Sequence, residues 1–267
     1  SINATFLAAA FSPVASAAGI KPVSLSLPQL TAQLKAAPPS ALIFDYDGTL
    51  TDRAADGKSL PASPEVLEGL SALARAGIPV GIVTGRVFNR RSLDEAEKMG
   101  IWGPLLSKIP ADLRHNIFFS GSFNGEFVSF DAAGQVTAAF ARGDARAAPF
   151  AAALAQQFAL RGLAYPVRGR DWIYASKSDK ESAARRVFKA MRKRGFQIDE
   201  ASVLIVGDDF RVPGGSDAPL ARALPRATLV SVGDQYAKAL AGGVRRLAER
   251  GAAATAKLIQ AVLASLG

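Results

Sequence analysis

Two carboxylates lie two positions apart in the segment that follows a short apolar run. Asp45 and Asp47 come directly after the run at residues 41–44, and Gly48 allows the backbone to turn sharply around them. Two anions this close repel each other unless a cation lies between them, and a hard divalent cation such as Mg²⁺ prefers carboxylate oxygens. The spacing therefore predicts a Mg²⁺ site at this point of the chain.

A hydroxyl group and a further acid follow two other apolar runs. Thr84 comes directly after the run at 80–83, where a helix is expected to begin. A hydroxyl and the free N–H groups of a helix start together form a seat for a phosphate group. Asp208 is the first acid after the run at 202–206, and the glycine before it leaves room for an ion. These positions predict a phosphate seat and a direct Mg²⁺ ligand.

The overall composition excludes several other chemistries. The 267 residues carry a net charge of +9, with a single His, His115, and no Cys. The lack of Cys excludes a disulfide scaffold, a thiolate metal site and a Cys nucleophile, and one His argues against a multi-His zinc site. Basic residues do not alternate with aromatic ones, so we expect small anionic partners and no nucleic acid. No apolar stretch reaches the roughly 20 residues that span a bilayer, so we expect no membrane partner.

Apolar runs alternate with helical patterns along most of the chain. Ser63 and Pro64 open a helix that Gly77 ends. Buried strands that alternate with helices form a doubly wound parallel sheet, so we expect an α/β fold in which ligands bind at the carboxyl ends of the strands. The strands are expected at residues 41–44, 78–83, 117–119, 202–206 and 228–232.

Residues 126–175 differ in pattern from the rest of the chain. A hairpin, an Ala-rich helix and a second hairpin follow one another there, which predicts a small inserted α+β cap domain. The cap would interrupt a core made of residues 38–125 and 176–267. Residues 1–37 are expected to form an N-terminal extension, either a helix or the remnant of a targeting segment. We expect a cytoplasmic protein, or an exported one if residues 1–17 end a signal peptide.

The segment from Asp45 to Thr51 resembles the first motif of the haloacid dehalogenase (HAD) superfamily of phosphotransferases. It reads Asp-x-Asp-Gly-Thr-Leu directly after an apolar strand. The resemblance implies that Asp45 attacks phosphorus and forms an aspartyl-phosphate. It also implies that Asp47 protonates the leaving oxygen and then activates water. Mg²⁺ would neutralise the charge that spreads over the phosphoryl oxygens.

Two later segments resemble the second and third motifs of that superfamily. The resemblance implies that Thr84 binds the transferring phosphoryl group, and Gly85 and Arg86 complete a Thr-Gly-Arg form seen in members that resemble sugar-phosphate phosphatases. The third motif is a Lys near the start of a core helix, which offsets repulsion between the nucleophile and the phosphate. Lys180 is preferred over Lys177, because it begins a sequence similar to the usual Lys-Gly-x-Ala.

The segment around Asp208 resembles the fourth motif and also departs from it. Many members place another Asp four residues after the first, where Val212 stands in this chain. The second acid of the metal site is therefore Asp209 or Asp217. We favour Asp217, because a Gly-Gly pair before it allows the loop to return to the site. The side chains of adjacent residues at a strand end, such as those of Asp208 and Asp209, tend to diverge.

The position of the insert adds a final resemblance. Asn124 and Gly125, between the second and third motifs, resemble the substrate-binding Asn-Gly of members with a type-2 α/β cap, such as Cof-like, sucrose-phosphate and trehalose-phosphate phosphatases and phosphomannomutase. The resemblance covers residues 40–235 and implies a Mg²⁺-dependent phosphatase that acts on a small phosphorylated metabolite, such as a sugar phosphate. Two alternatives stay open: a phosphomutase, and a non-catalytic binding protein on the same scaffold.

Overall fold

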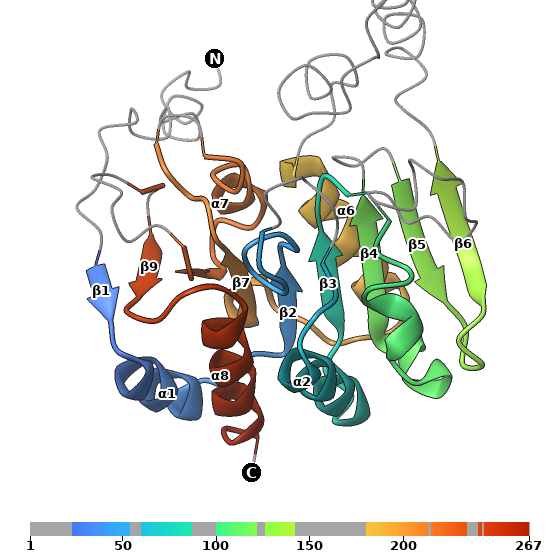
Figure 1. The fold of residues 1–267 in the computed structure, drawn as a ribbon, viewed down its shortest axis with the longest axis horizontal. Coiled ribbons are helices and arrows are strands. Elements are labelled where there is room, and N and C mark those ends of the chain that lie inside the picture. The colour runs from blue at the N-terminus through green and yellow to red at the C-terminus, as the bar shows by residue number, and fades with distance from the viewer. Residues whose placement is uncertain are drawn as a thin grey trace, which may run out of the picture.

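One large sheet forms the centre of the protein. Within the residues that the structure describes, nine strands are arranged in the order β1-β9-β8-β7-β2-β3-β4-β5-β6 (Figure 1). The strands from β1 to β4 in this order are parallel, and β5 and β6 add an antiparallel hairpin. The expected α/β class is confirmed. The structure is a computed structural model that describes residues 23–53, 60–86, 100–121, 126–141, 180–212, 215–233, 240–241 and 243–266.

The described elements have the following bounds. The strands are β1 (Val23–Leu25), β2 (Ala41–Phe44), β3 (Val80–Val83), β4 (Ile117–Gly121), β5 (Glu126–Phe130), β6 (Val136–Ala141), β7 (Val203–Gly207), β8 (Thr228–Ser231) and β9 (Val244–Leu247). The α-helices are α1 (Leu27–Ala36), α2 (Pro64–Arg75), α6 (Lys180–Lys193), α7 (Leu220–Ala223) and α8 (Gly251–Leu263). Short 3₁₀ helices are η1 (Leu106–Lys108), η2 (Ala111–Asn116) and η4 (Glu200–Ser202).

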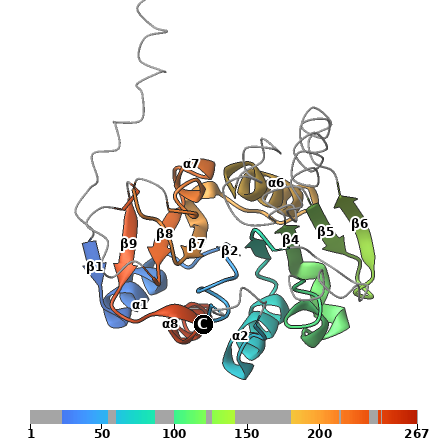
Figure 2. The ribbon, with the colours of Figure 1, turned by 45° about the horizontal axis from the view of Figure 1, so that its top comes forward.

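Helices cover both faces of the sheet (Figures 1 and 2). The group of α1, α2 and α8 packs on one face, and the pair of α6 and α7 packs on the other. Successive residues of a strand point to opposite faces, so Leu42 and Phe44 of β2 join the apolar core of the first group. Ile43, between them, joins the core beneath α6. Burial on both faces explains why the central strands read as continuous apolar runs.

The registers of three neighbouring strands bring the expected site segments together. The last residue of β2 pairs with Ile82 of β3 on one side and with Val206 of β7 on the other. Asp45, Thr84 and Asp208 follow these paired positions within two residues. Because the three strands are parallel, all three side chains emerge at the same edge of the sheet.

The first hairpin that we expected in the cap belongs to the main sheet instead. β5 pairs antiparallel with β4, β6 pairs with β5, and the turn between them contains Gly134 with a φ of +73°. A hairpin pattern predicts two paired strands but does not say which sheet they join. The core therefore continues to Ala141, beyond the boundary that we expected at residue 126. Residues 142–175 of the expected cap lie outside the described residues.

Part of the expected N-terminal extension also belongs to the core. β1 pairs with β9 at the edge of the sheet, and α1 packs on α8. A capping box formed by Ser26 and Gln29 begins α1. Residues 23–36 are thus part of the sheet and of the helices that cover it, although the sequence suggested that the core begins at residue 38. Residues 1–22 lie outside the described part of the chain.

A glycine in β3 allows α6 to lie close against the sheet. A Cβ atom at Gly81 would lie 2.5 Å from Cγ1 of Val187 in α6 and 3.2 Å from Cγ1 of Ile43 in β2. The first of these distances is shorter than van der Waals contact, so a larger residue would push the helix away. Lys180 is the first residue of α6. The close contact at Gly81 therefore helps to set the position of Lys180.

Replacing this glycine tests how tightly α6 is docked. We expect Gly81→Ala to lower the free energy of unfolding by about 1–3 kcal/mol, because the added methyl group overpacks the interface between β3 and α6. Gly103→Ala is the matched control, since a Cβ atom there meets nothing within 4 Å. Urea denaturation of both variants measures the difference. Equal stability of the two variants would contradict the close docking.

Candidate active site

Three carboxylates converge at the carboxyl edge of the sheet. Asp45 follows β2, Asp208 follows β7, and Asp217 precedes α7. Each offers an oxygen atom that lies within 4.8 Å of the other two. Asp45 and Asp217 are buried, and Asp208 is partly exposed. We refer to these three residues as the carboxylate cluster.

The ammonium group of Lys180 lies between two members of the cluster. Its Nζ donates to Oδ1 of Asp45 at 2.7 Å and to Oδ1 of Asp217 at 2.5 Å. All three side chains are almost fully enclosed, so these charges are poorly screened by water. Burial opposes the charged form of Lys180, but the two carboxylates outweigh it and raise the pKa of the ammonium group.

Burial also opposes the charged form of Asp45, and for a carboxyl group this effect raises the pKa. Burial, and after it the neighbouring Asp217 carboxylate, raises the pKa of Asp45, against the lowering effect of Lys180. Burial likewise raises the pKa of Asp208, although Arg53 acts against it. Three carboxylates meet only two cations here, Lys180 and Arg53, so full ionisation of the cluster leaves negative charge that these cations do not neutralise. Additional positive charge would therefore be favourable at this site.

The second oxygen of Asp217 holds the loop after β7. Oδ2 accepts from the backbone N–H of Asp208 at 2.9 Å and from that of Asp209 at 3.0 Å. A Cβ atom at Gly207 would lie 2.5 Å from this oxygen, so the glycine makes the approach possible. The geometry joins Asp217 to the loop that carries Asp208, as the Gly-Gly pair in the sequence suggested.

The alternative acid, Asp209, lies outside the carboxylate cluster. Its carboxylate accepts from Nε of Arg211 at 2.6 Å and from the backbone N–H of Ser216 at 3.0 Å. These bonds lower the pKa of Asp209, although burial acts the other way. Of the two candidates, the structure brings Asp217 to the cluster and holds Asp209 on Arg211. A metal role for either stays a prediction.

Asp47 also lies outside the carboxylate cluster, although it was expected to share the metal site with Asp45. Both of its carboxylate oxygens accept from Arg86, Oδ2 from Nε at 2.7 Å and Oδ1 from Nη2 at 2.6 Å. We expected Arg86, with Thr84 and Gly85, to bind substrate. The structure places Thr84 beside Arg86, whose backbone N–H donates to the Thr84 hydroxyl oxygen at 3.1 Å.

Sequence reasoning missed Arg53, which binds a member of the cluster. Its Nε and Nη2 donate to the two oxygens of Asp208 at 2.9 and 2.8 Å. Gly48 brings the two loops this close, because a Cβ atom there would lie 2.2 Å from Oδ2 of Asp208, and its φ is +78°. In the sequence, only the closeness of Arg53 to the first motif could have indicated a role in the site, because its partner Asp208 lies 155 positions away along the chain. Asn124, Gly125 and Lys177 lie outside the described residues.

The donors of the carboxylate cluster suit a hard divalent cation. Mg²⁺ and similar ions take oxygen ligands, and Mg²⁺ is commonly held by one or two carboxylates together with water and phosphate oxygens. Asp45, Asp208 and Asp217 supply such oxygens, and as three carboxylates they outnumber the two cations, Lys180 and Arg53, that pair with them. The residues present therefore fit a divalent metal.

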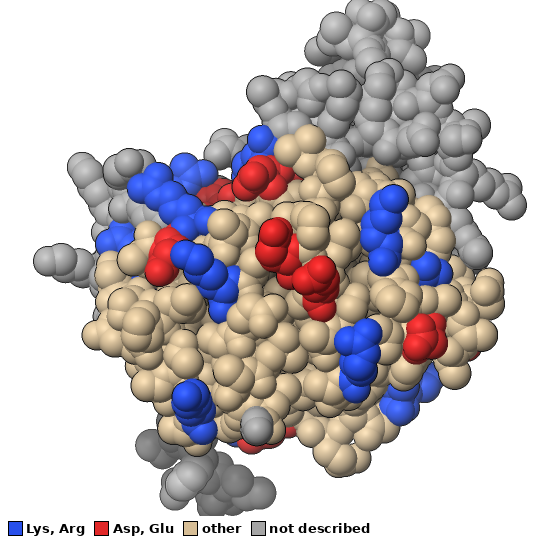
Figure 3. Space-filling model, turned by 60° about the horizontal axis from the view of Figure 1, so that its bottom comes forward, with Lys and Arg blue, Asp and Glu red and all other residues tan. Residues whose placement is uncertain are grey.

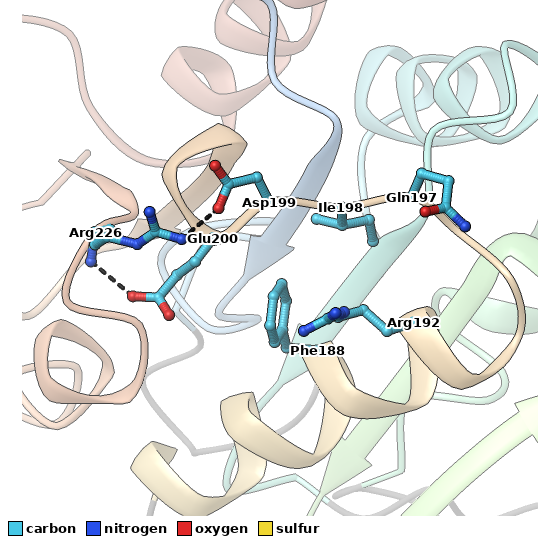
Figure 4. A pocket seen from close by; sticks show the side chains of 7 residues that line it. All are labelled: Phe188, Arg192, Gln197, Ile198, Asp199, Glu200 and Arg226. Carbon is cyan, nitrogen blue, oxygen red and sulfur yellow. Dashed lines mark hydrogen bonds and ion pairs between the residues drawn. The ribbon is translucent and has the colours of Figure 1, made fainter.

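Away from the carboxylate cluster, the described residues form a hollow and a surface of mixed charge. The hollow, of about 500 Å³, lies near the amino end of β7, the opposite end of the strand from Asp208. There the Arg226 guanidinium pairs with Asp199, and the Arg226 backbone N–H donates to the Glu200 carboxylate (Figure 4). It contains no residue that the sequence singled out. On the face drawn in Figure 3, basic and acidic side chains are interspersed. Among the described residues, no helix is both long enough and apolar enough to cross a membrane.

Comparisons with known proteins bear on the fold. No protein-family model matches this sequence, and no curated protein matches it by sequence. Trehalose-6-phosphate phosphatase of Aspergillus fumigatus is similar in two crystal forms, with TM-scores of 0.53 and 0.52 and identities of 20% and 19%, over 91% of this chain and 99% of that one. An IMP-nucleotidase of Plasmodium falciparum gives a TM-score of 0.47 at 13% identity, over 90% of this chain and 70% of that one. At these identities, the likeness to the Aspergillus structures shows a shared fold.

Removing the ammonium group from the cluster should destabilise the protein. We expect Lys180→Met to lower the free energy of unfolding by about 3–5 kcal/mol, because it leaves two buried carboxylates facing each other without a cation. Adding Asp217→Asn to Lys180→Met should restore part of the loss, since it removes one of the two charges. Thermal and urea denaturation measure both effects. If the double variant were less stable than Lys180→Met, the ammonium group would not act by neutralising this pair.

The Arg53 ion pair leads to a prediction about metal affinity. A divalent cation at Asp208 must compete with the Arg53 guanidinium, so Arg53→Gln should bind Mg²⁺ about 1.5- to 5-fold more tightly, the range expected for a partly exposed ion pair. Arg211→Gln is the matched control, because Arg211 pairs with Asp209 outside the cluster. Calorimetric titration of the purified proteins with Mg²⁺ gives both affinities. Equal tightening in the two variants would show only a general effect of charge.

Proposed function

We propose that this protein is a Mg²⁺-dependent phosphatase that hydrolyses a small phosphorylated metabolite, specifically a sugar phosphate, through an aspartyl-phosphate intermediate. The observation that carries the proposal is the buried contact of Lys180 with Asp45, in a carboxylate cluster at the carboxyl edge of a parallel sheet. The fold is shared with a protein named for its action on trehalose-6-phosphate. That name motivates the choice of a sugar phosphate among small phosphorylated substrates.

Asp45 is the group that we assign to nucleophilic attack. Its oxygen forms a bond to phosphorus, the bond from phosphorus to the leaving oxygen breaks, and the electron pair departs on that oxygen. Lys180 is within hydrogen-bonding distance of Asp45, so its positive charge offsets repulsion between the carboxylate and the phosphate dianion. A carboxylate nucleophile thereby divides one difficult displacement into two easier ones.

Asp47 is assigned to proton transfer because its carboxylate is separate from the cluster. In the first half of the reaction its protonated form donates the proton to the leaving oxygen and becomes the carboxylate whose two oxygens accept from Arg86. In the second half it accepts a proton from the water that attacks phosphorus and releases Asp45. The exposed fraction of the Asp47 side chain is 21%, so substrate and water can reach a carboxylate that is held firmly by Arg86.

The remaining groups bind the phosphoryl group and the metal. The Thr84 hydroxyl accepts from the backbone of Arg86, so its own hydrogen is available to a phosphoryl oxygen. Asp45, Asp208 and Asp217 would hold Mg²⁺. When bound, Mg²⁺ neutralises charge that develops on the phosphoryl oxygens.

Replacing the nucleophile tests the proposal directly. We expect the purified protein to release phosphate from sugar phosphates in the presence of Mg²⁺, and Asp45→Asn to lower kcat by about 10³-fold or more, because an amide is a poor nucleophile. Asp199→Asn, at the exposed pair with Arg226, is the matched control and should keep full activity. Phosphate release from a panel of phosphorylated sugars and nucleotides measures both variants. Retention of about a tenth of the activity by Asp45→Asn would contradict the covalent mechanism.

A further inference from the structure

The guanidinium group of Arg86 holds both oxygens of Asp47. Its Nε and Nη2 make two short bonds, at 2.7 and 2.6 Å, and only 8% of the Arg86 side chain is exposed. A single bond would leave the carboxyl plane free to rotate, whereas two parallel bonds fix it. The orientation of Asp47 is therefore set by one residue at the end of the neighbouring strand, β3.

The backbone of the same residue orients a second group. The N–H of Arg86 donates to Oγ1 of Thr84 at 3.1 Å. This bond uses a lone pair of the hydroxyl oxygen and leaves the hydroxyl hydrogen for another acceptor. The position of Arg86 thus ties the Thr84 hydroxyl to the Asp47 carboxylate, although the two belong to different strand ends.

We propose that Arg86 is a positioning residue that acts through Asp47 and aims its carboxyl group at the leaving oxygen of the substrate. This inference rests on the proposed phosphatase function and refines it. From the sequence we expected Arg86 to bind substrate. A guanidinium has two edges that can each donate two parallel bonds, and the edge formed by Nε and Nη2 already faces Asp47.

If Arg86 binds the phosphoryl group, its loss should lower kcat/KM equally for all leaving groups. If Arg86 positions Asp47, the loss of kcat/KM should depend on the leaving group. An arginine that binds the phosphoryl group contributes equally to every substrate that carries this group. A residue that positions the proton donor matters most when the leaving oxygen is strongly basic and needs a proton to depart. Substrates with the same shape and different leaving groups therefore separate the roles.

The experiment compares two aryl phosphates with the full-length protein at saturating Mg²⁺. In 4-nitrophenyl phosphate the leaving oxygen is weakly basic, whereas the phenol released from phenyl phosphate has a pKa of about 10. We expect Arg86→Gln to lower kcat/KM for phenyl phosphate at least about tenfold more than for 4-nitrophenyl phosphate, within the range of about 10²–10⁴-fold that a general acid supplies. Arg86→Lys should show the same selective loss, because a lysine keeps the charge but cannot hold both oxygens.

Two further measurements complete the test. In an Asp47→Asn background, Arg86→Gln should no longer change the ratio of the two kcat/KM values, because the donor through which Arg86 acts is gone. Unfolding midpoints of all variants identify any that do not fold, and Arg86→Lys carries the comparison if Arg86→Gln does not fold.

The outcomes separate this inference from the proposed function. An equal loss on both substrates that Arg86→Lys restores would show that Arg86 binds the phosphoryl group, and it would overturn the inference while leaving the phosphatase intact. A selective loss that persists in the Asp47→Asn background would overturn it as well. A wild-type protein that hydrolyses neither the aryl phosphates nor any sugar phosphate would overturn the proposed function and this inference with it.

Discussion

The buried ammonium group of Lys180 is the interaction on which the rest of the site depends. It bridges Asp45, at the end of β2, and Asp217, in the loop before α7, and all three side chains are at most 5% exposed. Each buried charge costs several kcal/mol in desolvation, so none is tolerated without its partners. The first turn of α6, the end of β2 and the loop after β7 must therefore meet. Stability and the arrangement of the reactive groups rest on the same contacts.

Two further carboxylates at this edge, those of Asp208 and Asp47, are each held by an arginine from another segment. Arg53 binds Asp208, and Arg86 binds Asp47. Asp208 remains a member of the cluster, whereas Asp47, held by Arg86, lies outside it. The cluster around Lys180 gathers negative charge in a form that suits a cation, whereas Asp47 stands apart with a fixed orientation that suits proton transfer. Because their surroundings differ, the carboxylates of the cluster can bind a cation while the nearby Asp47 transfers a proton.

Local signals in the sequence were sufficient for the elements and for the ends of the strands. Continuous apolar runs marked β2, β3 and β7, because a strand buried on both faces has no polar side. Ser63 and Pro64 marked the start of α2, because a capping side chain and a fixed φ act within one turn. The sheet order and the membership of the β5–β6 hairpin were not predictable in this way, since pairing between strands depends on contacts that a local pattern does not contain.

The sequence by itself determined that Asp45, Thr84 and Asp208 follow buried strands and that Lys180 begins a helix, because each of these facts depends on a few adjacent residues. Only the tertiary structure decided that Asp217 joins the cluster while Asp209 does not, and which cation holds each carboxylate. Arg53 and Asp208 are 155 positions apart, and Lys180 and Asp45 are 135 apart. Contacts over such separations are set by the packing of α6 and the return of the loop after β7 against the sheet. These contacts depend on how the whole core packs, so no single segment of the sequence predicts them.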